Sequence, residues 1–182
     1  MTVWFVADTH WNHKNIITYC TRPFSSVEEM NEVLIQNWNA VVSPGDLVYH
    51  LGDFGFGDVV PILRALNGRK VLILGNHDKS SRKPEARLLF DHLASMETIE
   101  VEGQTIVLCH YGMQVWPKSS RGSWHLFGHS HGTLKECGKS MDVGVDATRL
   151  FRPISYAEVV VAMGYRSENL DFKFGEDHVK SV

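Results

Sequence analysis

The chain has 182 residues, a formal net charge of −3 and a hydrophobic fraction of 43%. A chain of this length suits one domain with a buried core, and we expect residues 1–182 to form it. The small net charge gives no reason to expect a nucleic acid or a membrane surface as a partner. The N-terminus lacks a signal-peptide pattern, and no apolar run approaches the roughly 20 residues needed to cross a bilayer.

The three cysteines, Cys20, Cys109 and Cys137, lie far apart in the sequence. Because they form no Cys-x-x-Cys pair, a thiolate zinc site is not expected. An odd number of scattered cysteines is typical of a reducing compartment, so we expect a cytoplasmic location.

Five short apolar runs predict strands, because they are rich in β-branched or aromatic residues and are bounded by glycine or polar residues. In chain order they are residues 3–7, 47–51, 71–74, 106–109 and 124–127. Residues 97–101 and 105–109 flank Glu-Gly and predict a hairpin. Residues 170–174 fit either an edge strand or a loop.

Helices are predicted between and after these strands. Ser25 or Ser26 can cap the first, whose apolar residues recur on one face as far as Trp38. A second spans about residues 59–66, and Ser-Tyr-Ala-Glu at 155–158 is a capping box that opens a last helix through about residue 162. Strands that alternate with helices predict a layered α/β domain.

Polar side chains follow the five apolar runs at the point where each run ends. Near-continuous apolar strands are buried on both faces, and ligands of α/β sheets bind at the carboxyl ends of the strands. We therefore expect these side chains to gather at one edge of the sheet. The endings are Asp-Thr-His at 8–10, Gly-Asp at 52–53, Gly-Asn-His-Asp at 75–78, His at 110 and Gly-His-Ser-His at 128–131.

Carboxylate, amide and imidazole groups without sulphur predict a metal site for Mn, Fe, Zn or Ni rather than Mg or Ca. Asp8 and His10 can reach one ion if the chain turns there, and His129 and His131 can divide between two neighbouring ions. A single aspartate after a strand is ordinarily a cap or turn residue, and a single histidine ordinarily packs or hydrogen-bonds. Only the ordered set of five endings predicts metal binding.

This ordered set resembles the calcineurin-like metallophosphoesterase superfamily, and in particular its small single-domain bacterial and phage members. The matching motifs are D-x-H at 8–10, G-D at 52–53, G-N-H-D at 75–78, His110 and G-H-x-H at 128–131. The resemblance implies a four-layer α/β/β/α sandwich of mixed sheets flanked by helices. It also implies two divalent metal ions, for which we favour Mn, with Fe, Ni or Zn as alternatives.

The resemblance further implies how the ligands divide. Asp53 would bridge the two ions, and a hydroxide between them would attack phosphorus. One ion would be bound by Asp8, His10 and His131, and the other by Asn76, His110 and His129.

His77 would be a catalytic residue in this scheme rather than a ligand. By resemblance it faces the leaving group, and Asp78 hydrogen-bonds its other ring nitrogen, which would raise its basicity. Protonated His77 would then donate a proton to the departing oxygen.

Other polar and aromatic residues near the motifs carry weaker expectations. Arg22, with Asn12 and Lys14, could bind a phosphate oxygen, with solvent exposure as the alternative. An exposed ring at Tyr111 or Trp116 could stack on a base, with core packing as the alternative. The basic residues at 79–87 are expected to form an ordinary solvated loop, and Asp142 and Asp146 are treated as structural.

The expected function is hydrolysis of small or nucleotide-like phosphodiesters, because a chain this short has no room for a large cap domain over the site. A phosphomonoesterase or nucleotidase with the same site is the first alternative. A nuclease is the second, which the weak net charge does not favour. A non-catalytic scaffold of the same fold is disfavoured because His77 and every ligand type are present. The sequence leaves the physiological substrate and the oligomeric state open.

Overall fold

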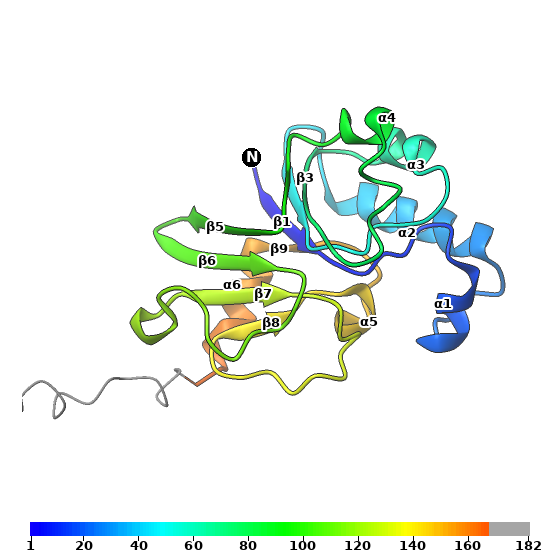
Figure 1. Cartoon of the computed structure of the whole chain (residues 1–182). Helices are drawn as coiled ribbons and strands as arrows, with labels where there is room; N and C mark the ends of the chain where they lie inside the picture. Colours follow the sequence, from blue (N-terminus) through cyan, green and yellow to red (C-terminus); the bar gives the residue numbers. More distant parts are fainter. Residues whose placement is uncertain (168–182) are drawn as a thin grey trace, which may run out of the picture.

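A computed structural model describes residues 1–167 (Figure 1). The first of its two sheets has the strand order β4-β3-β2-β1-β9. Strands β1 to β4 run parallel to their neighbours, and β9 is antiparallel to β1. The strands are Val3–Val6 (β1), Leu47–His50 (β2), Arg69–Ile73 (β3), Leu93–Ala94 (β4) and Ile154–Ser155 (β9).

The second sheet has the order β5-β6-β7-β8. Its first two strands form the predicted antiparallel hairpin, and β6, β7 and β8 run parallel. An isolated parallel bridge between Ala7 and Gly144 links the end of β1 to the segment after β8. The strands are Met96–Val101 (β5), Gln104–Cys109 (β6), Trp124–Phe127 (β7) and Ser140–Asp142 (β8).

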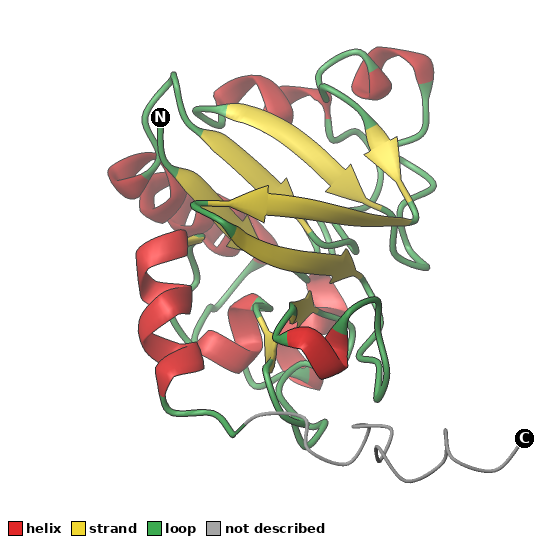
Figure 2. Cartoon of the chain, turned by 90° about the vertical axis from the view of Figure 1, so that its left-hand side faces the viewer, coloured by secondary structure: helices red, strands yellow, loops and turns green. Residues whose placement is uncertain are grey.

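Helices flank the strands (Figure 2). The first predicted helix is confirmed as α2, where the Ser26 hydroxyl accepts a hydrogen bond from the Glu29 N–H. The predicted capping box of Ser155 and Glu158 is present at the start of α6. The helices are Lys14–Tyr19 (α1), Val27–Val41 (α2), Val60–Ala65 (α3), Pro84–Arg87 (α4), Val145–Thr148 (α5) and Tyr156–Gly164 (α6), with a 3-10 turn at Ser119–Arg121 (η1).

Two apolar cores hold these layers together. One joins the first sheet to its helices and includes Met30, Leu34 and Trp38 of α2. The other fills the space between the sheets, with Phe5 from the first and Ile106 from the second. Burial of this apolar area is the main stabilising contribution. The predicted fold class is confirmed, since two mixed sheets pack together and helices flank them.

The outer face of the second sheet is covered in part by the loop between β6 and β7. Trp116 of this loop is buried, its ring centroid lies 5.3 Å from that of His125 on β7, and its Nε1 donates to the Ser123 carbonyl. Trp116 therefore belongs to the core and is not free to stack on a base.

Within residues 1–167, no helix combines the length and apolar character required to span a membrane. The strand or loop predicted at 170–174 lies outside the described residues.

Candidate metal centre

The carboxyl ends of β1, β2 and β3 meet those of β6 and β7 around one cavity of about 850 Å³. The convergence at strand ends expected from the sequence is therefore present. Predicted site residues that line the cavity are His10, Asp53, Asn76, His77, His129 and His131. Asp8 and His110 lie beneath them and are buried.

The backbone at these strand ends is unusual. Five of the predicted ligands have positive φ angles, a left-handed conformation that is uncommon outside glycine. Main-chain hydrogen bonds hold the first of these turns, since the Asp8 N–H donates to the Gly52 carbonyl and the His10 N–H to the Asp53 carbonyl. The five are Asp8 (57°), His10 (52°), Asp53 (55°), His129 (68°) and His131 (47°).

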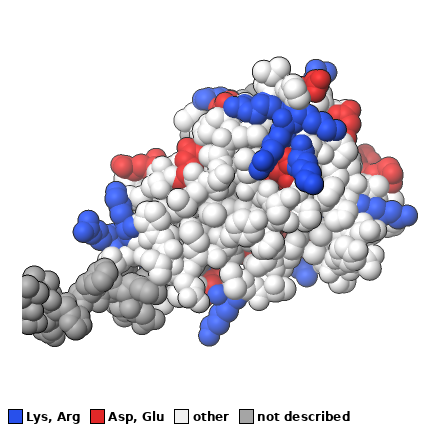
Figure 3. Space-filling view, in the orientation of Figure 1, with Lys and Arg blue, Asp and Glu red and all other residues white. Residues whose placement is uncertain are grey.

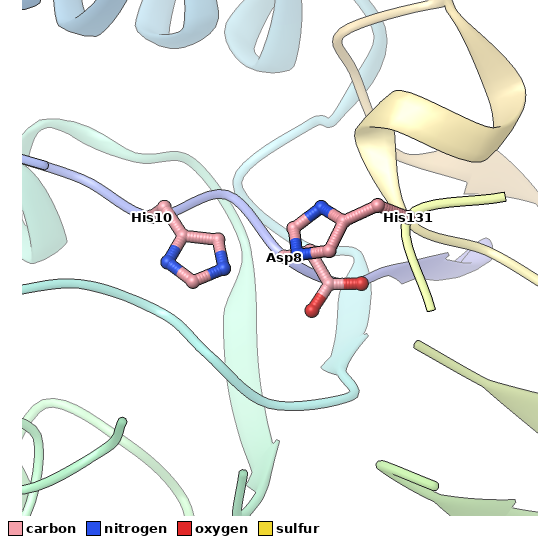
Figure 4. Close-up of side chains that lie close together, drawn as sticks. All are labelled: Asp8, His10 and His131. Carbon is pink, nitrogen blue, oxygen red and sulfur yellow. The ribbon is translucent and has the colours of Figure 1, made fainter. Parts of the chain in front are cut away.

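One group of candidate ligands consists of Asp8, His10 and His131, whose side chains point toward one another (Figure 4). One possible ligand atom from each lies within 4.8 Å of the others. The Oδ1 of Asp8 and both ring nitrogens of His10 are buried and have no hydrogen-bond partner. Because buried polar atoms are nearly always paired, the unpartnered Oδ1 of Asp8 and the unprotonated ring nitrogen of neutral His10 fit a bound cation.

Burial also sets the protonation of this group. It lowers the pKa of His10 to about 2, with His131 and other cations adding to the effect. Neutral imidazole is the form that binds metals. Burial, together with the charges of Asp142 and Asp53, raises the pKa of Asp8 well above its ordinary value. A cation beside Asp8 would oppose that rise.

The second group consists of Asp53, His110 and His129, whose possible ligand atoms also lie within 4.8 Å of one another. The Oδ1 of Asn76 lies 3.2 Å from Nε2 of His110. Nδ1 of His110 is 2.7 Å from the Leu51 carbonyl, to which it donates. That hydrogen bond fixes the tautomer and leaves Nε2 free to bind an ion.

Asp53 lies between the two groups. Its Oδ2 is 3.6 Å from Nε2 of His10, and its Oδ1 is 3.6 Å from Nε2 of His110. One carboxylate oxygen thus faces each group, which is the arrangement a bridging ligand requires.

Residues 1–146 match the calcineurin-like phosphoesterase superfamily domain. The chain belongs to this superfamily. An uncharacterised protein of Methanocaldococcus jannaschii is 36% identical over 170 residues, which cover 87% of this chain and 89% of that protein. The gene 66 protein of Mycobacterium phage L5 is 28% identical over 179 residues, covering 79% of this chain and 86% of the phage protein. A crystal structure of a protein of unknown function from Aquifex aeolicus superimposes with a TM-score of 0.72 and 27% identity, covering 88% of this chain and 98% of that chain.

Two glycines of the superfamily motifs are explained by close approach of ligand side chains. A Cβ at Gly75 would collide with Oδ1 of Asp53, and a Cβ at Gly128 would lie 2.5 Å from Cβ of Ala7 and 2.8 Å from Oδ2 of Asp8. Since a side chain at either position would displace a carboxylate, the two glycines leave room for the candidate ligands.

The expectation that Arg22 binds a phosphate oxygen is wrong. Its guanidinium group is buried and donates to both carboxylate oxygens of Asp146, at 2.9 and 2.7 Å. It also donates to the main-chain carbonyls of Asp8 and Thr9, at 2.7 and 2.8 Å. Arg22 therefore stabilises the left-handed turn that carries the first ligands.

Sequence reasoning missed the role of Asp146, which orients a candidate ligand. Its Oδ2 lies 2.7 Å from Nδ1 of His131, so the other ring nitrogen faces the first group. The hydrogen bonds from Arg22 and His131 lower the pKa of Asp146 despite its burial, so it stays ionised. Nothing local in the sequence marks this residue, because its partner Arg22 is 124 positions away.

The expected hydrogen bond between Asp78 and the His77 ring is absent, and the catalytic role given to Asp78 is corrected. Its Oδ2 accepts hydrogen bonds from the N–H groups of Asp53 and Gly75, and its Oδ1 from that of Phe54. Asp78 is buried and binds the loop after β2 to the loop after β3. His77 itself is exposed at the cavity, and its N–H donates to Oδ1 of Asp53 at 2.9 Å.

Asn12 and Lys14, the other two residues expected to contact substrate, do not line the cavity. The Asn12 amide donates to the carbonyls of Phe56 and Asp58 and accepts from Asn31, so its hydrogen bonds fix a loop. Lys14 is the first residue of α1, is exposed, and is not among the cavity-lining residues.

The basic segment after the third motif lies outside the cavity. Lys79, Arg82 and Lys83 are exposed, and lysine and arginine side chains gather on the upper part of the face shown in Figure 3. None of the three lines the cavity.

Proposed function

We propose that this chain is a two-metal phosphodiesterase that hydrolyses small or nucleotide-like phosphodiesters. The position of Asp53, with one carboxylate oxygen facing each candidate ligand group, is the observation that carries the proposal. Asp8, His10 and His131 would hold one ion, and Asn76, His110 and His129 the other. We favour Mn, with Fe, Ni or Zn as alternatives, because the donors are imidazole and oxygen.

Two bound divalent ions would supply an activated water at neutral pH and neutralise the phosphate oxygens. Other residues of the chain hold the candidate ligands in position. Arg22 and Asp146 hold the first group in place through the contacts described above. Buried Leu51 and Asp78 fix the loops that carry His110 and Asp53.

His77 is the proposed proton donor to the leaving oxygen. Its ring lies at the cavity, 5.9 Å between centroids from the His10 ring and 5.4 Å from the Phe56 ring. The His77 N–H donates a hydrogen bond to Asp53, which fixes the position of the His77 main chain beside the proposed bridging carboxylate. A positioned imidazole of this kind accelerates such steps by about 10²–10⁴-fold.

The cavity volume of about 850 Å³ is large enough to admit a diester. That space exceeds a phosphate group and leaves room for two ester substituents. A phosphomonoesterase or nucleotidase with the same residues is the alternative, and a nuclease is a second.

The test is a panel of metals and substrates on metal-free protein. Mn, Fe, Ni, Zn and Mg would each be paired with bis(4-nitrophenyl) phosphate, 4-nitrophenyl phosphate, cyclic nucleotides and single-stranded nucleic acid. We expect the diester to be hydrolysed with the highest kcat/KM, and Asp53→Asn to abolish that activity. Asp91→Asn, which alters an exposed aspartate paired with Arg69, is the matched control. Faster hydrolysis of the monoester, or an active Asp53→Asn variant, would contradict the proposal.

A further inference from the structure

Three large apolar side chains are exposed at the rim of the cavity. Tyr19 is 72% exposed, Tyr111 46% and Leu134 47%, and all three line the same cavity as the candidate ligands. Exposed apolar groups that cluster at a concave site mark a place where a ligand buries apolar surface. We refer to Tyr19, Tyr111 and Leu134 as the apolar rim.

The apolar rim has two sides, with Tyr19 on one and Tyr111 and Leu134 on the other, and both sides line one cavity. Tyr19 ends α1, and the next residue, Cys20, has its Sγ 3.3 Å from Nδ1 of His131. This short distance places the end of α1 beside the loop after β7, which continues to Leu134. On that second side, Leu134 packs so closely over Gly112 that a Cβ there would collide with it. The Tyr111 ring stands edge-on to His129, with centroids 4.8 Å apart.

The cavity carries little positive charge of its own. Its lining, as far as residues 1–167 form it, includes neither lysine nor arginine. Arg22, whose guanidinium group contacts the main chain of Asp8 and Thr9, is buried and paired with Asp146. The proposed metal ions can neutralise one phosphate group, but the described lining offers no lysine or arginine for a second or third phosphate.

We propose that the apolar rim binds a planar, uncharged ring, such as a nucleobase or an aryl group, of a substrate with a single phosphate. This inference rests on the proposed function, because the phosphate is placed at the candidate metal centre. A ring there would stack on Tyr19 or Tyr111 and contact Leu134. Nucleoside polyphosphates are excluded as preferred ligands.

The test compares two singly charged diesters that differ in their rings. Binding of diphenyl phosphate and of diethyl phosphate to the Mn-loaded full chain would be measured by calorimetry. We expect diphenyl phosphate to bind about fivefold or more tightly, since stacking on an aromatic side chain commonly contributes that much. Equal affinities would overturn the proposal. So would thymidine 5′-diphosphate binding tenfold more tightly than thymidine 5′-phosphate.

Substitutions in the apolar rim test whether these residues cause the preference for diphenyl phosphate over diethyl phosphate. We expect Tyr19→Ala and Leu134→Ala each to lower the ratio of the two affinities. The matched controls are Tyr165→Ala and Leu88→Ala, whose side chains are 89% and 83% exposed and do not line the cavity. An unchanged ratio in both rim variants would overturn the assignment. Failure of the proposed function would be a different result, namely that no ester in the metal panel is hydrolysed. Binding of the two diesters can still be measured in that case.

Discussion

At the scale of single residues, left-handed turns determine how the paired ligands at 8/10 and 129/131 are presented. Residues two apart on an extended strand lie on the same face, roughly 6.6 Å apart. Positive φ at Asp8 and His10 breaks the strand and brings both side chains to the first group. His129 and His131 have the same conformation and serve different groups. Such strain is maintained by surrounding contacts, here from Gly52, Asp53 and Arg22.

His77→Ala separates proton donation from the other steps of the reaction. An ester with a poor leaving group needs a proton on its departing oxygen, whereas nitrophenolate departs without one. We expect kcat on an alkyl diester to fall by about 10²-fold or more, and kcat on bis(4-nitrophenyl) phosphate to fall much less. The measurement is kcat for both substrates in the variant and the wild type. Equal losses on both would argue against an acid role for His77.

Asp146→Asn tests whether this carboxylate orients His131. The change weakens the hydrogen bond to Nδ1 of His131 and leaves buried Arg22 without a charged partner. Loss of such an orienting partner typically lowers metal affinity by about 10–100-fold. Calorimetric titration with Mn is expected to show one of two binding events weakened by that factor.

The other binding event serves as an internal control for that variant, because Asp146 contacts no residue of the second group. Thermal unfolding of the metal-free variant reports separately on the loss of the buried ion pair. If both Mn ions bind as they do to the wild type, Asp146 has no orienting role.

At the scale of elements, the strand endings were the informative part of the sequence. Apolar runs that stop at a polar group predict both the strand and its ligand, and the endings at Asp8, Asp53 and His110 do converge at one cavity edge. Partners set by tertiary packing could not be predicted in this way. Arg22 and Asp146 are 124 residues apart, and only the packed fold shows that they form a pair. The prediction for Asp78 was wrong for a different reason. Asp78 follows His77 in the sequence, but the turn points its carboxylate at main-chain N–H groups instead of at the His77 ring.

At the scale of the whole molecule, the site lies where two sheets meet, and it concentrates negative charge in a chain whose net charge is only −3. The charges of Asp142, Asp53 and Asp146 all raise the pKa of Asp8. Each group consists of three possible ligand residues, and each combines residues from both sheets. Bound ions would therefore link the sheets and relieve the repulsion between these carboxylates.

Removal of metal is accordingly expected to destabilise the folded chain. A ligand at about 100 times its Kd stabilises the native state by about 2.7 kcal/mol, so two ions contribute about 5 kcal/mol. For a chain of this size that corresponds to a fall in Tm of about 10–20 °C. Calorimetric melting with a chelator, and again after Mn is restored, measures the difference. The Asp53→Asn variant should lose most of it because both groups share that residue, whereas Asp91→Asn should retain it. Identical melting with and without saturating Mn would show that the carboxylates and imidazoles at the strand ends hold no ion in solution.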